Sequence, residues 1–257
     1  MEDVQKYEDT RQIAINKVGI KSLKYPITVL DKKNNKQHTV ADVSMFVNLP
    51  HHTKGTHMSR FLQVLNEYHE KITMGNMVEV LKVMQNRLEA DESFMELTFP
   101  YFIEKEAPVS KIKGIMNYKC SFIGHCKKDK GDFILKVEVP ITSLCPCSKE
   151  ISNYGAHNQR SILTIEAKYD EFLWLEDLID VAEKSGSCEL YSLLKRVDEK
   201  YVTEYAYDNP GFAEDIVRNA AQKLMDLKNI TWFRVQVENF ESIHNHSAYA
   251  CIEKQLR

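Results

Sequence analysis

Apolar and polar residues alternate along four segments in the first half of the chain, with the period of a half-buried β-strand. These segments are residues 25–30, 43–49, 93–104 and 111–127. Between the second and the third, apolar residues recur every three or four positions over 61–68 and 77–88, which predicts two amphipathic helices. The first half therefore predicts the element order ββααββ.

The second half repeats this order. Alternation predicts strands at 133–139, 161–169, 231–240 and 246–253, and helical spacing falls at 174–183, 188–196 and 213–227. Two such modules, residues 1–128 and 129–257, predict an α+β fold in which antiparallel sheets carry helices packed on one face.

Composition narrows the class of protein. The 257 residues carry a formal net charge of −3, so the chain lacks the excess of positive charge that favours nucleic-acid binding. No apolar run in the sequence reaches the ~20 residues needed to span a bilayer. The polar N-terminus favours a cytoplasmic protein. Loops of the GxxxxGK[ST] and GxGxxG kinds are absent from the sequence, which argues against a P-loop NTPase or a Rossmann enzyme.

The strongest chemical signal is a cluster of thiols and an imidazole in the second half. One proline separates Cys145 from Cys147, and His157 follows closely. In an extended chain the two sulfur atoms point to opposite sides, so a metal ion takes only one and leaves the other as a nucleophile or acid–base group. Two small buried cysteines in a turn are the alternative that the residues alone leave open.

Other candidate groups lie further along the chain. His244 and His246 share one face if their segment is a strand, where they can bind metal or transfer protons, or they belong to a hairpin bend. Glu199 lies in a charge run typical of a solvated helix end, but its carboxylate can also bind a metal ion. Glu214 borders an apolar stripe and is either a surface carboxylate or an acceptor for two N–H groups of a planar heterocycle.

Cations accompany these groups. Lys54, His57 and Arg60 precede or begin a predicted helix, whose N-terminal amides favour anions, although a simple helix cap explains the segment equally well. Five further cations lie beside the other candidates and can bind a polyphosphate: Lys149, Arg160, Lys195, Arg196 and Lys200.

Several motifs in this order resemble the type IB GTP cyclohydrolases, the bacterial family that opens the folate pathway. They are KGTHMSRF, LCPCSKEIS, GAHNQRS, the charge run LLKRVDEKYVTE with its following NP, and ESIHNHSAYA. The resemblance extends over nearly the whole chain, with a small departure at Val197, where the family pattern has proline.

This resemblance implies a tunnelling fold of two ββααββ modules and a homotetramer with active sites at subunit interfaces. It implies that GTP and water become 7,8-dihydroneopterin triphosphate and formate. It also implies a divalent metal ion (Mn²⁺, Zn²⁺ or Fe²⁺) bound by Cys145, His157 and Glu199, which activates water for attack on guanine C8.

The remaining roles follow from the same resemblance. His244 or His246 is implied in proton transfer or as a further ligand, Glu214 in binding the purine edge, and Cys147 as the other candidate thiol.

Two different functions remain open at this point. A tunnelling-fold nitrile reductase acting on a deazapurine would use a cysteine nucleophile and NADPH, and a non-catalytic nucleotide-binding protein would use a metal only for stability.

Overall fold

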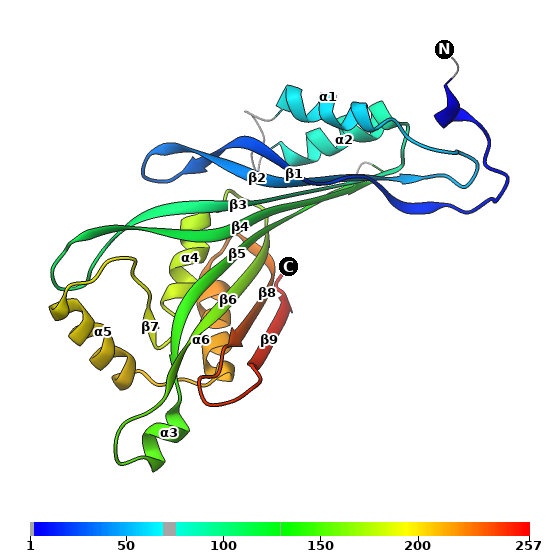
Figure 1. Cartoon of the computed structure of the whole chain (residues 1–257). Coiled ribbons are helices and arrows are strands. Elements are labelled where there is room, and N and C mark those ends of the chain that lie inside the picture. The colour runs from blue at the N-terminus through cyan, green and yellow to red at the C-terminus, as the bar shows by residue number, and fades with distance from the viewer. Residues whose placement is uncertain (1–2, 69–75, 129) are drawn as a thin grey trace. The chain divides into compact units, whose positions relative to one another are not determined.

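The computed structural model describes residues 3–68, 76–128 and 130–257 (Figure 1). The strands form one hydrogen-bonded sheet in the order β1-β2-β3-β4-β5-β6-β8-β9, with β7 paired to β5. The chain divides into two compact units, residues 1–100 with 121–135 and residues 101–120 with 136–257. Because three strands contribute to both units, the division into modules 1–128 and 129–257 stays a prediction.

The first unit contains a long hairpin and two helices. Its elements are the short helix η1 (Val4–Lys6), β1 (Ile15–Asp31), β2 (Asn35–Leu49), α1 (Met58–Tyr68), α2 (Met77–Leu88) and the first-unit parts of β3 (Glu92–Glu106), β4 (Lys113–Lys127) and β5 (Lys130–Leu144). Every second residue from Ala41 to Leu49 is buried, which is the alternation seen in the sequence. Helices α1 and α2 lie on one side of β1 and β2 and bury Phe61 and Leu81 (Figure 1).

The second unit repeats this plan with additions. Its further elements are α3 (Pro146–Ile151), β6 (Asn158–Tyr169), α4 (Leu175–Glu183), β7 (Cys188–Glu189), α5 (Arg196–Asp208), α6 (Ala213–Asp226), β8 (Ile230–Asn239) and β9 (Ala248–Gln255). Helices α4 and α6 pack against β6, β8 and β9, and their buried residues include Leu178 and Leu224. The predicted strands and the predicted α+β class are confirmed.

One predicted helix is wrong. Residues 188–196 form the two-residue strand β7 and a loop, and the helix α5 begins only at Arg196, within the charge run. The apolar residue at the start of this segment, Cys188, is buried because β7 pairs with β5, not because it lies on a helix.

Asp198 fixes the beginning of α5. Its side chain is fully buried, and it accepts hydrogen bonds from the Val109 and Ser110 N–H groups (2.9 and 2.8 Å), the Ser110 hydroxyl (2.5 Å) and the Lys195 N–H (2.9 Å). The Lys195 contact is a helix cap, and the others join α5 to the loop between β3 and β4. Burial opposes ionisation of Asp198, but the hydrogen bonds from Ser110, Lys195 and Val109 outweigh it and hold the pKa well below its ordinary value.

Replacement of Asp198 tests this anchor. Because the pKa of Asp198 is lower in the folded than in the unfolded chain, its ionised form stabilises the fold above about pH 4 and loses this effect as the pH falls further. We expect Asp198→Asn to lower the melting temperature at pH 7 by on the order of 5 °C. The difference in melting temperature between the variant and the wild type should become smaller below pH 4. The control is Glu204→Gln, at an exposed carboxylate of the same helix; equal, pH-independent losses in both variants would contradict the anchor.

Candidate active site

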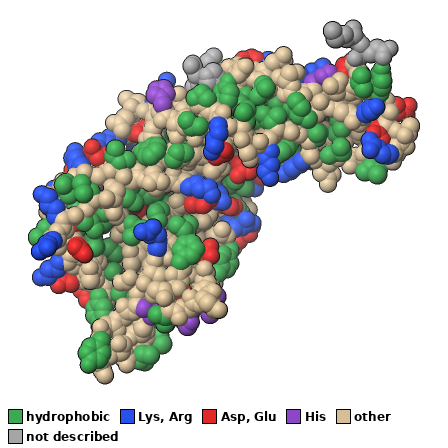
Figure 2. All heavy atoms as spheres, viewed as in Figure 1, with side chains coloured by type: hydrophobic (Ala, Val, Ile, Leu, Met, Phe, Trp, Pro, Cys, Tyr) green, Lys and Arg blue, Asp and Glu red, His purple; other side chains and the backbone are tan. Residues whose placement is uncertain are grey.

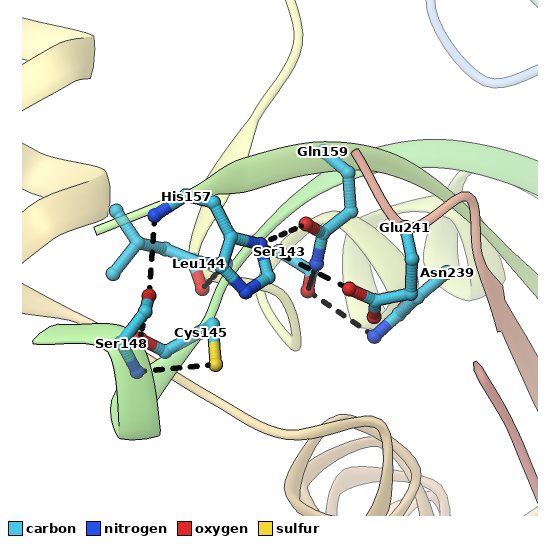
Figure 3. A network of polar contacts seen from close by, with 9 residues as sticks. Ser143, Leu144, Cys145, Ser148, His157, Gln159, Asn239 and Glu241 are labelled. Atoms are coloured by element: carbon cyan, nitrogen blue, oxygen red, sulfur yellow. Dashed lines mark hydrogen bonds and ion pairs between the residues drawn. The ribbon is translucent and has the colours of Figure 1, made fainter. Parts of the chain in front are cut away.

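The candidate site is built where β5 ends and β6 begins, both in the second unit. The Cys145 N–H donates to the His157 carbonyl (3.1 Å), so the chain between them is a closed loop (Figure 3). The His157 N–H in turn donates to the Ser148 hydroxyl (3.1 Å). The sheet therefore brings Cys145 and His157 to adjacent positions.

The two cysteines of this loop have different environments. Cys145 is the N-cap of α3, with Pro146 in the first helical turn, and its sulfur atom accepts the Ser148 N–H (3.4 Å). Cys145 is half-buried and Cys147, inside α3, is exposed. The expectation of an extended Cys-Pro-Cys segment is wrong, because the chain turns into a helix at Pro146.

A buried polar network holds the His157 ring. Its Nδ1 atom lies 3.0 Å from Gln159 Oε1 and 3.9 Å from Glu241 Oε2, and the side chains of His157 and Glu241 are only 14% and 12% exposed. Gln159 Nε2 donates to the Ser143 hydroxyl (2.9 Å), which also receives a hydrogen bond from Asn239 Nδ2 (3.2 Å) (Figure 3).

Sequence reasoning missed the groups around the ring. The alternation along β6 could have indicated Gln159. Residues two apart on an extended chain share a face, and Gln159 and Ser161 are both buried. No comparable pattern indicated Glu241, which lies in the irregular segment after β8.

Glu214 lies at the start of a helix that is tied to the same region. The Gly211 N–H donates to the carbonyl of Leu144, the residue before Cys145 (3.0 Å). Glu214 is exposed in the first turn of α6, while its neighbour Asp215 accepts the Phe212 N–H (3.1 Å) as a cap. This arrangement brings the beginning of α6 next to the end of β5.

The two histidines near the C-terminus are not on a strand. Residues 242–246 form bends and β9 begins at Ala248, so of the two alternatives left open by the sequence the bend is observed and the strand is not. Both rings are exposed, and they stack with centroids 5.1 Å apart at an angle of 18°. The bend begins directly after Glu241, which contacts His157, so His244 and His246 are only a few residues in sequence from the polar network around His157.

Among the described residues, Glu199 does not form a three-ligand group with Cys145 and His157. It is exposed in the first turn of α5. The opposite end of this helix contacts α3, because Lys149 Nζ donates to the Tyr207 carbonyl (2.5 Å) and lies 4.2 Å from the ring centroid of Tyr207. Tyr207 is eight positions after Glu199 in the same helix, which is about 12 Å along the helix axis.

The donors present suit a divalent metal in part. Cys145 and His157 offer sulfur and nitrogen, and an acceptor on Nδ1 is the usual second contact of a metal-binding imidazole. Within the described ranges of one chain, however, no three side chains of His, Cys, Asp or Glu are grouped to hold one ion. The backbone pairing therefore makes Cys145 and His157 neighbours but does not complete a ligand set.

The cations are distributed over both units. Lys195, Arg196, Lys200 and Arg160 are exposed in the second unit. In the first unit, Arg60 donates to the Arg87 carbonyl (2.7 Å) and His57 pairs with Asp3 (3.1 Å). Lys54 is exposed and lies 5.8 Å from the ring centroid of Tyr7. Lys149 and Arg60 thus have structural contacts within the chain.

Comparison with solved structures identifies the fold. A uricase from Bacillus fastidious has a TM-score of 0.56 at 7% identity, over 93% of this chain and 92% of that chain. A hyperthermostable mutant of Bacillus sp. TB-90 urate oxidase has a TM-score of 0.55 at 8% identity, over 94% and 98%. At such identities the likeness concerns the fold alone, and it confirms the tunnelling fold. Among the residues described, none of the helices has the length and apolar character needed to cross a membrane.

Sequence comparison identifies the family. A family model described as type I GTP cyclohydrolase folE2 matches residues 1–250. The GTP cyclohydrolase FolE2 of Geotalea uraniireducens (strain Rf4) is 58% identical, over all of this chain and 94% of the relative. That of Nitrosococcus oceani is 56% identical over 99% of this chain and 96% of the relative. The chain therefore belongs to the FolE2 family of type I GTP cyclohydrolases, the type IB enzymes.

Proposed function

We propose that this enzyme is a metal-dependent GTP cyclohydrolase that converts GTP and water to 7,8-dihydroneopterin triphosphate and formate, the first step of tetrahydrofolate synthesis. The observation that carries the proposal is the pairing of Cys145 with His157 across the ends of β5 and β6, with the imidazole held by Gln159 and Glu241. Family membership supports the cyclohydrolase activity over the nitrile reductase and non-catalytic alternatives.

The ligand assignment rests on exposure and contacts. Cys145 is the thiol beside His157, whereas Cys147 is exposed within α3 and is assigned to substrate or proton chemistry. When bound, Mn²⁺, Zn²⁺ or Fe²⁺ supplies Lewis-acid activation of water and of the guanine ring. A mixed set of sulfur, nitrogen and oxygen ligands does not select strongly among these ions.

The other residues bind and protonate the substrate. Glu214, exposed at the start of α6 beside the end of β5, accepts two N–H groups of the guanine edge. His244 and His246 are exposed in the bend after Glu241, where a neutral or protonated imidazole can exchange a proton with guanine N7.

A second copy of the chain completes the ligand set. Within one chain Glu199 is separated from the end of α5 that contacts α3, so its carboxylate reaches Cys145 and His157 from a neighbouring subunit of a homotetramer. The exposed position of Glu199 in the first turn of α5 is compatible with an interface role. Arg160, Lys195, Arg196 and Lys200 are exposed cations of the second unit that can bind the triphosphate, which positions the ring for reaction.

Activity measurements test the function. With GTP and Mn²⁺ or Zn²⁺ we expect release of formate and a pterin that fluoresces after oxidation, and loss of both on chelation of the metal. Cys145→Ser should lower kcat by at least about 100-fold and reduce the bound metal. The matched control is Cys251→Ser, at an exposed cysteine on β9, which should leave both unchanged. Absence of formate with every divalent metal tried would reject the proposal.

Complementation between inactive variants tests the shared site. Cys145→Ser and Glu199→Gln should each be inactive, but co-expression of the two should restore about a quarter of the wild-type sites, because half of the subunits provide an intact thiol and half an intact carboxylate. Cys145→Ser with His157→Ala is the control pair, since both residues lie on the same side of the interface and no intact site can form. Equal activities of the two mixtures would place Glu199 outside the site.

Substitution of Glu214 tests guanine binding. Glu214→Gln replaces one acceptor by a donor, so two hydrogen bonds to the purine edge are weakened or lost, and kcat/KM for GTP should fall by about 100-fold or more. Bound metal, measured by elemental analysis, should not change. Asp226→Asn, at an exposed carboxylate at the other end of α6, is the control, and a similar small loss in both variants would assign Glu214 to the surface.

A further inference from the structure

His157 has two ring nitrogens, and among the described residues polar contacts are seen for Nδ1. Nδ1 faces the Gln159 side-chain oxygen at 3.0 Å and Glu241 at 3.9 Å. A neutral imidazole carries one proton, and only its unprotonated nitrogen can bind a metal ion. The position of that proton therefore decides which nitrogen is available as a ligand.

We propose that Gln159 is a positioning residue that holds the proton of His157 on Nδ1 and so presents Nε2 to the metal. This inference rests on the proposed function, because it concerns the same metal site. Gln159 itself needs no contact with metal or substrate, since it is 7% exposed and lies beside the imidazole in the network of Figure 3.

The orientation of the Gln159 amide is set by Ser143. Gln159 Nε2 donates to the Ser143 hydroxyl (2.9 Å), and Oε1 faces His157. Ser143 is 1% exposed and receives a second hydrogen bond from Asn239 Nδ2 (3.2 Å), so the amide groups of Gln159 and Asn239 both use it as acceptor. In this arrangement Gln159 can only accept from the ring, which requires a proton on Nδ1.

Hydrogen bonding alone also permits the reverse arrangement. If the amide were rotated by 180°, Ser143 would donate to Oε1, Nε2 would donate to His157 Nδ1, and the ring proton would lie on Nε2. Glu241 disfavours this alternative on electrostatic grounds. Its carboxylate is on the Nδ1 side of the ring and is only 12% exposed, so it favours an N–H over a lone pair at that nitrogen.

The strand geometry explains why these residues meet. His157 directly precedes β6 and is two residues before Gln159, so in the extended chain the two side chains lie on the same face. Ser143 lies near the end of the adjacent strand β5, and Asn239 ends β8, the other neighbour of β6. The network is therefore built on three adjacent strands, which gives the imidazole a rigid support.

The proton position can be measured without metal or substrate. ¹⁵N spectra of the metal-free, histidine-labelled enzyme at pH 8.5 distinguish a protonated Nδ1 from a protonated Nε2, and subtraction of the His157→Gln spectrum assigns the residue. We expect the Nδ1–H form to predominate in the wild type. Gln159→Leu, which cannot accept a hydrogen bond, should raise the Nε2–H fraction. A wild type that is predominantly Nε2–H would overturn the inference.

Metal affinity is the second readout. Competition of the metal-free enzyme with a chromophoric chelator for Zn²⁺ should show 10–100-fold weaker binding by Gln159→Leu, the usual cost of removing such a supporting contact. The control is Thr164→Val, which removes a buried hydroxyl from the same strand outside the network. Ser143→Ala makes a smaller change and serves if Gln159→Leu does not fold; it should shift the proton populations in the same direction.

The outcomes separate the two proposals. A wild type whose Zn²⁺ binding does not depend on His157, judged with His157→Ala, contradicts the proposed metal site. Wild-type Zn²⁺ affinity and wild-type proton position in a folded Gln159 or Ser143 variant contradict the positioning role while leaving the metal site intact.

Discussion

The backbone hydrogen bond from Cys145 to His157 is the constraint on which the candidate site depends. It extends the pairing of β5 with β6 beyond the strand ends, so the loop 146–156 leaves and returns at neighbouring positions. Adjacent strands lie about 4.8 Å apart, so this pairing sets the distance between the Cys145 and His157 backbones independently of the loop, which carries exposed residues such as Ile151 and Tyr154.

The sequence predicted those elements whose residues are buried at a regular period. The strands β2 and β5 have an inward residue at every second position along most of their length, and α6 has a stripe from Ala213 to Leu224. The elements that were missed lack such a stripe. Helix α3 has no buried residue, and α5 buries only Asp198 and Ala206, so neither leaves a helical period in the pattern of apolar residues.

The site was less predictable than the fold, and Asp198 and Glu199 show why. Both belong to one charge run, and from sequence both are typical of a solvated helix end. In the structure Asp198 is fully buried and Glu199 is exposed, because consecutive residues of a helix point about 100° apart. Which of the two turns inward depends on the Val109 and Ser110 amides, which are distant in sequence and cannot be located from the pattern around α5.

The same contacts limit how a metal site can form. Helix α5 is held at its first turn by Asp198 and at its last turn by Lys149, which joins it to α3. With both ends fixed, α5 cannot slide along its axis to carry Glu199 toward Cys145 without breaking a buried carboxylate network or the Lys149 contact. Bending is equally restricted, because the helix contains no proline or glycine between Arg196 and Asp208. Helix α5 therefore holds Glu199 on an exposed first turn at a fixed position within the subunit.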